Sequence, residues 1–255
     1  MNETNGNNMK KGVWTHPFFM THTDMQNKIY FISLGPGHHD MMTIAALKAL
    51  EKADIIYCPA TSKGSRAAQL LHAAGIDRNK IKTYLLPMLK DRDAAYAIYD
   101  QVCEEALGLY GKGLDIAITA EGDAGLYSST AYMSQKMQEK RAETTHIAGI
   151  PAFIAAAASA GIPVAEQEET VKIFPGTATA ASLCEAAANG TAIVMKVSQC
   201  ADEIRKAIAM TDDRCTWHYF ENVGTEDEFR STAPEEILSR KMPYFSLLII
   251  KRRQV

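Results

Sequence analysis

The sequence predicts an α/β protein built as two α/β domains with a cofactor cleft between them. Short apolar, β-branched segments bounded by Gly, Pro or Asp alternate with segments that repeat apolar residues at helical spacing. Strands that alternate with helices are typical of βαβ units and mainly parallel sheets. Loops that are rich in glycine follow predicted strands in both halves of the chain, which indicates one site shared by the two domains.

Each expected element has its own sequence signal. Strands are predicted at 28–34, 54–58, 114–119, 144–148, 171–174, 192–197, 217–222 and 244–251. Helices are predicted at 43–52, 65–74, 91–110, 128–140, 151–160, 179–188, 200–209 and 234–240. The strongest break in mid-chain follows the helix at 128–140. We therefore expect an N-terminal domain over 26–140 and a C-terminal domain over 141–255.

Residues 1–25 are polar and rich in asparagine, and they lack the apolar stretch of a signal peptide. We expect a disordered or loosely docked arm that is dispensable for cofactor binding, because this composition cannot build a core. The alternative is that Trp14, Phe18 and Phe19 anchor the arm to the protein. The five cysteines are odd in number and form no CxxC pair, which favours a reducing, cytoplasmic environment.

Charge and motif content exclude several function classes. The net charge of −3 gives no case for binding a phosphate backbone, so an acidic substrate would be held by local cations. No apolar run reaches membrane-spanning length. The chain has no H-E-x-x-H, no G-x-S-x-G and no clustered Cys/His set. The sequence therefore predicts neither a metal site nor a covalent nucleophile.

The first candidate site motif is Ser33-Leu34-Gly35-Pro36-Gly37, which ends a strand and leads into His38-His39-Asp40. Its glycines allow a tight turn and a close approach of the backbone to a ligand. Ligands of open α/β sheets bind outside the carboxyl ends of the strands, where this loop lies. A plain strand–helix turn would look the same, and the G-x-G-x-x-G of dinucleotide-binding proteins is absent.

The second motif runs from Ala120 to Thr130 and contains Gly122, Asp123 and Gly125. Exposed backbone N–H groups at the start of a helix suit an anionic group. Asp123 would either pair with a cation or cap the following helix. Three further loops, at 148–153, 195–197 and 221–225, also follow predicted strands.

Together these motifs resemble the tetrapyrrole methylase family, the class III enzymes that use S-adenosylmethionine. The family's opening G-x-G-P-G-D-P-x-L-L-T is matched by 33–43, its G-D-P-x-x-Y by 122–127, and its P-G-I-x-S/A by 148–152. The resemblance covers nearly everything from Lys28 to Lys251. The sequence departs from the family at His38 and His39, where the family has Asp-Pro, and at Ala124 and Ala148, where it has Pro.

Within the family, Glu121-Gly122-Asp123 with Tyr127-Ser128-Ser129-Thr130 is most similar to the precorrin-2 C-20-methyltransferases. The resemblance implies a tetrapyrrole substrate, precorrin-2 or its cobalt complex, and a homodimer. It leaves open a methylase of another corrin position and a catalytically silent tetrapyrrole-binding protein. Candidates for a general base are His38, His39 and Asp40, unless this is only a solvated loop. The resemblance implies cofactor contacts at Pro36, Gly122, Asp123, Leu126, Ser128, Pro151, Ala152, Met195 and Gly224.

Overall fold

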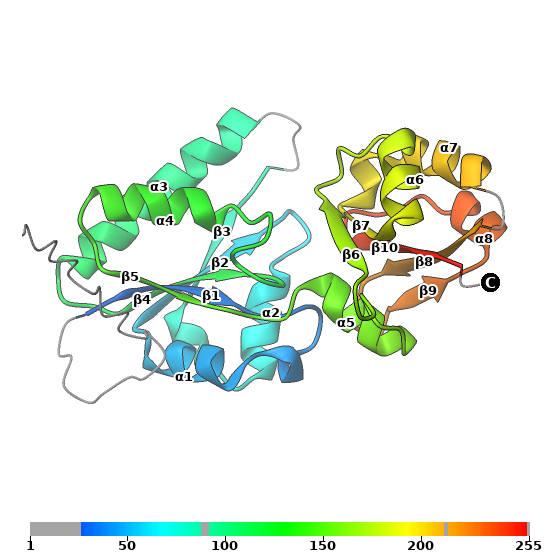
Figure 1. Ribbon diagram of the computed structural model, residues 1–255. Helices are drawn as coiled ribbons and strands as arrows, with labels where there is room; N and C mark the ends of the chain where they lie inside the picture. Colours follow the sequence, from blue (N-terminus) through cyan, green and yellow to red (C-terminus); the bar gives the residue numbers. More distant parts are fainter. Residues whose placement is uncertain (1–26, 88–91, 212–213, 254–255) are drawn as a thin grey trace, which may run out of the picture.

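The computed structural model describes residues 27–87, 92–211 and 214–253. The expectations for residues 1–25, including the arm and its aromatic anchor, lie outside these residues. The described chain forms two five-stranded sheets, each with its own helices (Figure 1). The predicted α/β class with two α/β units is therefore confirmed. No helix within the described residues is long and apolar enough to cross a membrane.

The first sheet is parallel throughout and has the order β3-β2-β4-β1-β5. Its strands are β1 (Ile29–Ser33), β2 (Ile55–Ala60), β3 (Ile81–Leu85), β4 (Ile116–Ala120) and β5 (Thr144–Ile147). Its helices are α1 (Ile44–Lys52), α2 (Arg66–Ala73), α3 (Arg92–Tyr110) and α4 (Thr130–Glu139). α1 and α2 cover one face of the sheet, and α3 and α4 cover the other (Figure 1).

The neighbouring strands β1 and β4 of this sheet are buried on both faces. Tyr30 and Ile32 of β1 pack with α1 and α2, whereas Ile29 and Phe31 pack with α3 and α4. Side chains alternate between the two faces of a strand, so a central strand covered on both sides must be apolar at every position. The helix after β1 and the helix after β4 lie on opposite faces although the two strands are neighbours. This is the switch point at which open parallel sheets bind ligands.

The second sheet has the order β6-β7-β10-β8-β9 and is mostly antiparallel. Only β6 and β7 are parallel; β10 runs antiparallel to both of its neighbours, as β9 does to β8. Its strands are β6 (Thr170–Phe174), β7 (Gly190–Met195), β8 (Cys215–Glu221), β9 (Phe229–Ser231) and β10 (Ser246–Arg252). The expectation of mainly parallel sheets is right for the first sheet and wrong for the second. A short turn joins β8 to β9, which forces the two strands to run in opposite directions.

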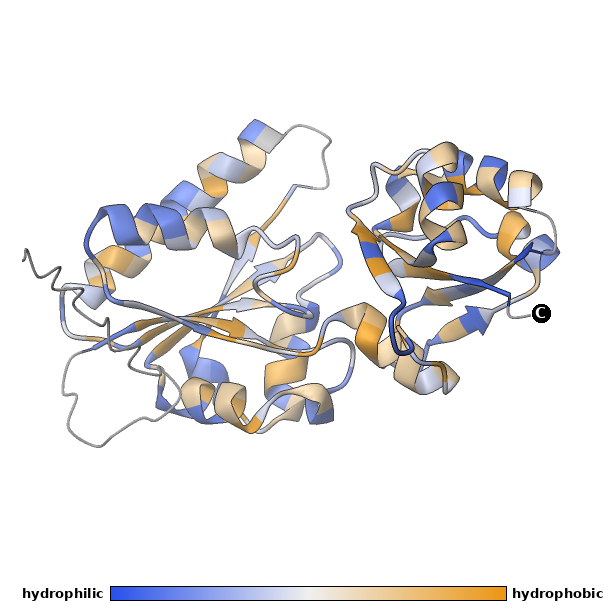
Figure 2. Cartoon of the chain, viewed as in Figure 1, coloured by the Kyte–Doolittle hydropathy of each residue, from blue (hydrophilic) through white to orange (hydrophobic). Residues whose placement is uncertain are grey.

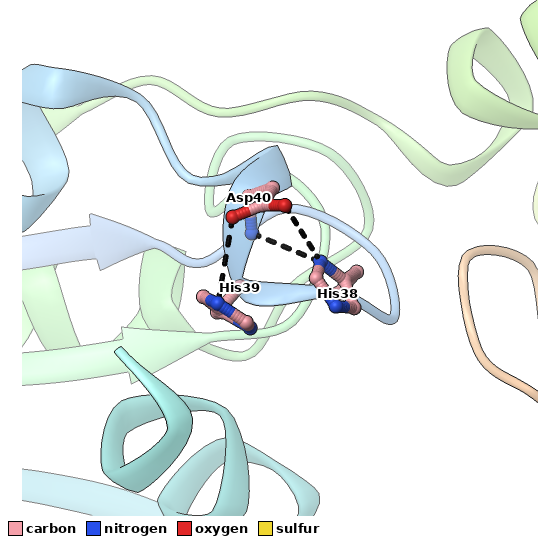
Figure 3. A group of neighbouring side chains, drawn as sticks. All are labelled: His38, His39 and Asp40. Atoms are coloured by element: carbon pink, nitrogen blue, oxygen red, sulfur yellow. Dashed lines mark hydrogen bonds and ion pairs between the residues drawn. The ribbon is translucent and has the colours of Figure 1, made fainter. Parts of the chain in front are cut away.

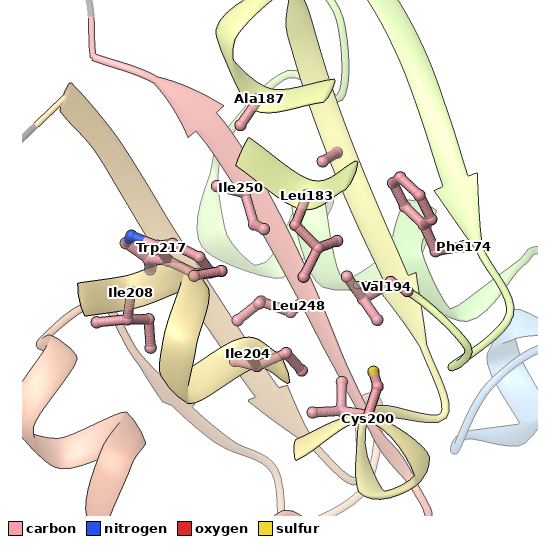
Figure 4. Close-up of a cluster of buried hydrophobic side chains, with 14 of the residues drawn as sticks. Phe174, Leu183, Ala187, Val194, Cys200, Ile204, Ile208, Trp217, Leu248 and Ile250 are labelled. Atoms are coloured by element: carbon pink, nitrogen blue, oxygen red, sulfur yellow. The ribbon is translucent and has the colours of Figure 1, made fainter. Parts of the chain in front are cut away.

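The core of the second unit lies between its sheet and three helices. These helices are α6 (Ala180–Ala188), α7 (Ala201–Thr211) and α8 (Pro234–Ser239). Figure 4 shows Leu183 and Ile204 meeting Val194, Leu248 and Trp217 from the strands. Colouring by hydropathy shows apolar residues concentrated in the strands of both sheets (Figure 2). Burial of these side chains provides most of the favourable free energy of folding.

The opposite face of the second sheet is covered by α5 (Ala152–Ala160), which also connects the two units. Phe153 of α5 packs against Ile193, Phe220 and Ile249. Met41, Leu126 and Ile150, from the loops of the first unit, are partly buried against the same cluster. The two units therefore meet through a shared apolar contact beside the loops that the sequence singled out.

The change from one sheet to the other comes later than the sequence indicates. β5 pairs with β1 over Ile29–Ile32, so the first sheet continues to Ile147. The expected boundary near residue 141 precedes this strand, and the second sheet begins at Thr170. The sequence indicates where a strand begins and ends, but not which strand it pairs with. The loop before β5 therefore looks like a linker between domains.

Candidate functional site

The loops after β1 and β4 are joined by a pair of backbone hydrogen bonds. Gly35 N–H donates to Gly122 O at 3.0 Å, and Gly122 N–H donates to Gly35 O at 2.9 Å. Both residues have positive φ, +70° and +71°, which favours glycine. The two motifs that the sequence placed at strand ends therefore form one structure at the switch point of the sheet.

Asp123 connects three segments through its carboxylate. Its Oδ1 accepts from Gly125 N–H at 2.8 Å, and its Oδ2 accepts from Gly149 N–H at 2.8 Å and from Ser33 Oγ at 3.4 Å. The N-cap of α4 is Ser129, so Asp123 is not that helix's cap. The hydrogen bonds of Asp123 instead fix the loops after β1, β4 and β5 relative to one another.

The loop after β5 lies directly against the other two. A Cβ atom added to Gly149 would come within 2.4 Å of Ser33 Cβ and 2.8 Å of Gly122 O. Real Cβ atoms do not approach other atoms this closely, so the packing requires glycine at 149. The carboxyl ends of β1, β4 and β5 thus form one rigid cluster.

Loops of the second unit contact this cluster from the other side. A Cβ atom on Gly37 would lie 2.2 Å from Val223 O, and one on Gly224 would lie 2.5 Å from Pro36 O. The turn after β8 therefore packs backbone to backbone on the turn after β1. This contact brings Pro36 and Gly224, two of the expected cofactor residues, next to each other.

A second set of contacts between the units involves the loop before α4. Tyr127 Oη donates to Ile173 O at 2.9 Å, and Lys196 Nζ donates to Tyr127 O at 3.1 Å. Both Tyr127 and Lys196 have left-handed backbone conformations, with φ of +51° and +55°. Non-glycine residues rarely adopt this conformation and tend to do so at functional sites. Met195, another expected cofactor residue, directly precedes Lys196 at the end of β7.

The described residues match a known family model over most of the chain. The model for tetrapyrrole (corrin/porphyrin) methylases matches residues 28–237, which include the first sheet, all strands of the second sheet except β10, and every loop described above. The chain belongs to the tetrapyrrole methylase family. The resemblance inferred from the motifs is therefore confirmed.

Curated relatives of this tetrapyrrole methylase share moderate identity with it. A probable cobalt-precorrin-2 C(20)-methyltransferase of Methanocaldococcus jannaschii is 31% identical over 149 residues, which are 58% of this chain and 64% of that protein. The precorrin-2 C(20)-methyltransferase of a Sinorhizobium species is 27% identical over 86% of this chain and 93% of its own. The cobalt-precorrin-2 C(20)-methyltransferase of Salmonella typhimurium is 26% identical over 90% and 98%.

Solved structures support the fold. A cobalt precorrin-4 methyltransferase superposes with a TM-score of 0.71 at 15% identity and covers 88% of this chain and 94% of its own. A uroporphyrin-III C-methyl transferase of Thermus thermophilus, solved with S-adenosyl homocysteine, gives a TM-score of 0.64 at 15% identity and covers 88% and 92%. At these identities the likeness establishes the shared architecture of tetrapyrrole methylases.

Several features of the cluster fit S-adenosylmethionine, the cofactor that the family resemblance implies. Pro151 is the N-cap of α5 and makes no side-chain cap, so the first N–H groups of the helix are open to an anionic or polar ligand group. The space beside Gly122 is also open, since an added Cβ would meet only Ala152 N, at 4.0 Å. Leu126 is half-buried at the interface between the units, and Ser128 Oγ contacts Thr130 Oγ1 at 2.9 Å. The residues present therefore suit a ligand with polar ends and an apolar middle.

His38, His39 and Asp40 form an exposed group at one edge of the interface between the units (Figure 3). His38 Nδ1 and His39 Nε2 each lie 3.4 Å from an oxygen of Asp40, and the centroids of the two imidazole rings are 4.2 Å apart with their planes tilted by 35°. Both histidines line a pocket of about 300 Å³ with Arg66 of α2 and Thr225 of the second unit. The two histidines lie beside solvent at this pocket. Their role as candidate bases stays a prediction.

The same group is also the one set of His and carboxylate side chains in the described residues whose ligand atoms lie close enough together for a metal ion, within 4.8 Å. Two imidazoles and a carboxylate are a ligand set that divalent transition metals accept. All three side chains are already engaged with one another, and Asp40 is 79% exposed. The expectation that the protein has no metal site stays a prediction.

The sequence reasoning missed Glu121 as a functional candidate. It follows β4 directly, and its side chain is only 24% exposed. Burial raises the pKa of Glu121 above the usual range of a carboxyl group, and the charge of Arg66 offsets this only in part. A charged residue immediately after a strand of five buried residues is the signal that could have identified it.

Proposed function

We propose that this tetrapyrrole methylase transfers a methyl group from S-adenosylmethionine to C-20 of precorrin-2 or of cobalt-precorrin-2, in the biosynthesis of the corrin ring of cobalamin. The main support is the joint position of the strand-end loops, which bring together the residues that the family resemblance assigned to the cofactor. The names of the relatives that align over most of the chain point to the same reaction.

The chemistry requires positioning more than it requires reactive protein groups. When bound, S-adenosylmethionine supplies an electrophilic methyl group on its sulfonium. The loops of Gly122, Asp123 and Pro151 would bind the polar end of the cofactor, and Pro36, Met195 and Gly224 would surround the remainder. Holding the acceptor carbon in line with the methyl group removes much of the entropic cost of a bimolecular displacement.

The test is an incubation of the purified protein with S-adenosylmethionine carrying a ¹³C-methyl group. Precorrin-2 and cobalt-precorrin-2 are supplied separately, and the products are measured by mass and by ¹³C NMR. We expect the product to gain the mass of one methyl group, located at C-20. A methyl group at another position would favour a different corrin methylase. No transfer despite measurable binding of S-adenosylhomocysteine would favour a catalytically silent protein.

We also propose, from cysteine usage, that the protein is cytoplasmic, and, from the family resemblance alone, that it forms a homodimer. Sedimentation velocity at micromolar concentration should give twice the chain mass of 28.0 kDa. A single species at the monomer mass would contradict the homodimer and leave the proposed reaction unaffected.

A further inference from the structure

We propose that Glu121 is the general base that removes the proton from C-20 once the methyl group has been transferred; this inference rests on the proposed function. The reaction needs such a group because it replaces hydrogen by methyl. The C–S bond of the sulfonium breaks as the new C–C bond forms at C-20. The C-20–H bond then breaks, its electrons restore the double bond at C-20, and the proton moves to the Glu121 carboxylate and on to water.

The position of Glu121 suits this role. It lies between the end of β4 and Gly122, whose backbone is paired with Gly35 at the centre of the loop cluster. It is two residues from Asp123, which fixes the loops expected to hold the cofactor. A base at this point is held by the end of a fully buried strand and by the paired loop that follows, so its location is well defined.

The carboxylate of Glu121 has few polar partners. Among the residues that the structure describes, the only cation within 4 Å is Arg66, whose Nε lies 3.6 Å from Oε2, and no hydrogen bond reaches the carboxylate. The Arg66 guanidinium is instead positioned 4.0 Å over the ring of Phe245. A largely buried carboxylate without hydrogen bonds is costly for stability, which is a reason to expect a functional role.

The other groups that face Glu121 come from three elements. They are Arg66 on α2, the thiol of Cys58 on β2 and the hydroxyl of Tyr244 just before β10. Burial raises the pKa of Tyr244 and raises that of Cys58 to about 12, so both stay neutral near pH 7. Among the described residues Arg66 is the one charged neighbour, and its charge favours the ionised form of Glu121 against the effect of burial. The ionised form of Glu121 is the base in this proposal, and His38, His39 and Asp40 are the more exposed alternatives.

Arg66 and the aromatic pair beside it form a surface suited to the substrate. The rings of Tyr244 and Phe245 lie 5.2 Å apart, and the two residues are 45% and 41% exposed. Exposed rings offer an apolar face to a flat tetrapyrrole, and Arg66 offers a cation for one of its carboxylates. Binding a substrate carboxylate would draw Arg66 away from Glu121 and strengthen the base.

The experiment compares wild type with Glu121→Gln, Glu121→Asp and Glu121→Ala. Glu143→Gln is the matched control, because Glu143 is also paired with a cation, Lys28, but precedes β5 at the opposite end of the sheet. We expect Glu121→Gln to lower kcat by roughly 100-fold or more, the usual contribution of a general base. The affinity for S-adenosylhomocysteine should stay within about twofold, which corresponds to a change of about 0.4 kcal/mol in binding free energy.

Two readouts separate a base from a structural group. Wild type and Glu121→Asp should lose kcat as pH falls through a pKa above the ordinary carboxyl value of about 4.3, and Glu121→Gln should lack this acidic limb. Precorrin-2 deuterated at C-20 should show a larger primary isotope effect with Glu121→Gln than with wild type, because proton removal becomes slow. Formate should restore part of the activity of Glu121→Ala.

The outcomes are distinguishable. No turnover of either substrate by wild type overturns the proposed function and this inference together. Wild-type turnover with a Glu121→Gln kcat within threefold of the Glu143→Gln control overturns the role of Glu121 alone. A Glu121→Gln variant that loses cofactor affinity, without a change in the isotope effect, also overturns it.

Discussion

Replacing Asp123 with alanine is expected to weaken the binding of S-adenosylhomocysteine by about one to two orders of magnitude. The carboxylate of Asp123 accepts hydrogen bonds from Gly125 N–H, Gly149 N–H and Ser33 Oγ. Each hydrogen bond to a charged group contributes roughly 1.5 to 3 kcal/mol, and the loss of one such bond in the bound state corresponds to this change in affinity.

Asp123 is expected to affect cofactor binding through the loops that it fixes. Without the carboxylate, the N–H groups of Gly125 and Gly149 lose their acceptor, and the loops after β4 and β5 separate. Asp123→Asn should have a smaller effect, because one amide oxygen can still accept but the amide nitrogen cannot. Isothermal titration with S-adenosylhomocysteine, together with a melting curve for each variant, measures both consequences.

Asp115 provides a matched control at the opposite end of β4. Its Oδ1 accepts from Lys28 N–H at 2.8 Å, and its Oδ2 lies 3.1 Å from Lys52 Nζ. Asp115→Ala should therefore lower the melting temperature as Asp123→Ala does but leave cofactor affinity unchanged. If Asp123→Ala behaves in the same way as Asp115→Ala, Asp123 has no role in the cofactor site.

Most of the fold could be predicted because its strands are buried and its helices are amphipathic. The two strands that the sequence analysis missed, β3 and β9, are both edge strands. β3 exposes Lys82 and Thr83 and lacks a clean apolar alternation, and β9 has only three residues. Edge strands bury less surface, so their sequences carry a weaker signal. The direction of the strands in the second sheet depends on connection geometry, which the residue pattern does not contain.

The site was predictable where it depends on backbone geometry. Gly35, Gly122 and Gly149 are required by left-handed conformation or close approach, and such requirements appear in the sequence as glycine motifs. The role of Asp123 as a loop-fixing group depends on Gly149, which is distant in sequence. The burial of Glu121 depends on Arg66 and on packing by the second unit. The contacts of Asp123 with Gly149 and of Glu121 with Arg66 join residues that are far apart in the sequence, and the residue pattern does not show such pairs.

Glu221→Ala is expected to destabilise the second unit by about 3 kcal/mol at pH 7. Glu221 is the last residue of β8, and its carboxylate is 7% exposed. It accepts from Arg240 Nε at 2.9 Å, from the Arg240 terminal nitrogen at 2.6 Å and from Tyr219 Oη at 2.7 Å. Removing the carboxylate leaves the buried hydroxyl of Tyr219 without its acceptor. It also releases the start of the turn that carries Gly224.

The effect should depend on pH in a defined direction. Burial alone would raise the pKa of Glu221, but the hydrogen bonds from Arg240 and Tyr219 outweigh it, and the pKa is lowered in the folded protein. A lowered pKa contributes stability above the unfolded value of about 4.3, and this contribution is lost as pH falls through the folded value. The free-energy gap between wild type and Glu221→Ala should therefore be largest near neutral pH and shrink below about pH 4.

Urea unfolding of both proteins from pH 7 downward measures this gap. Asp202→Asn serves as the control, because Asp202 pairs with Arg205 at 2.9 Å on the surface and is 91% exposed. Exposed pairs of this kind contribute less than about 1 kcal/mol, so the control should stay close to wild type at every pH. A Glu221→Ala variant that is as stable as Asp202→Asn, or a gap that does not change with pH, would show that the buried cluster does not stabilise the turn that carries Gly224.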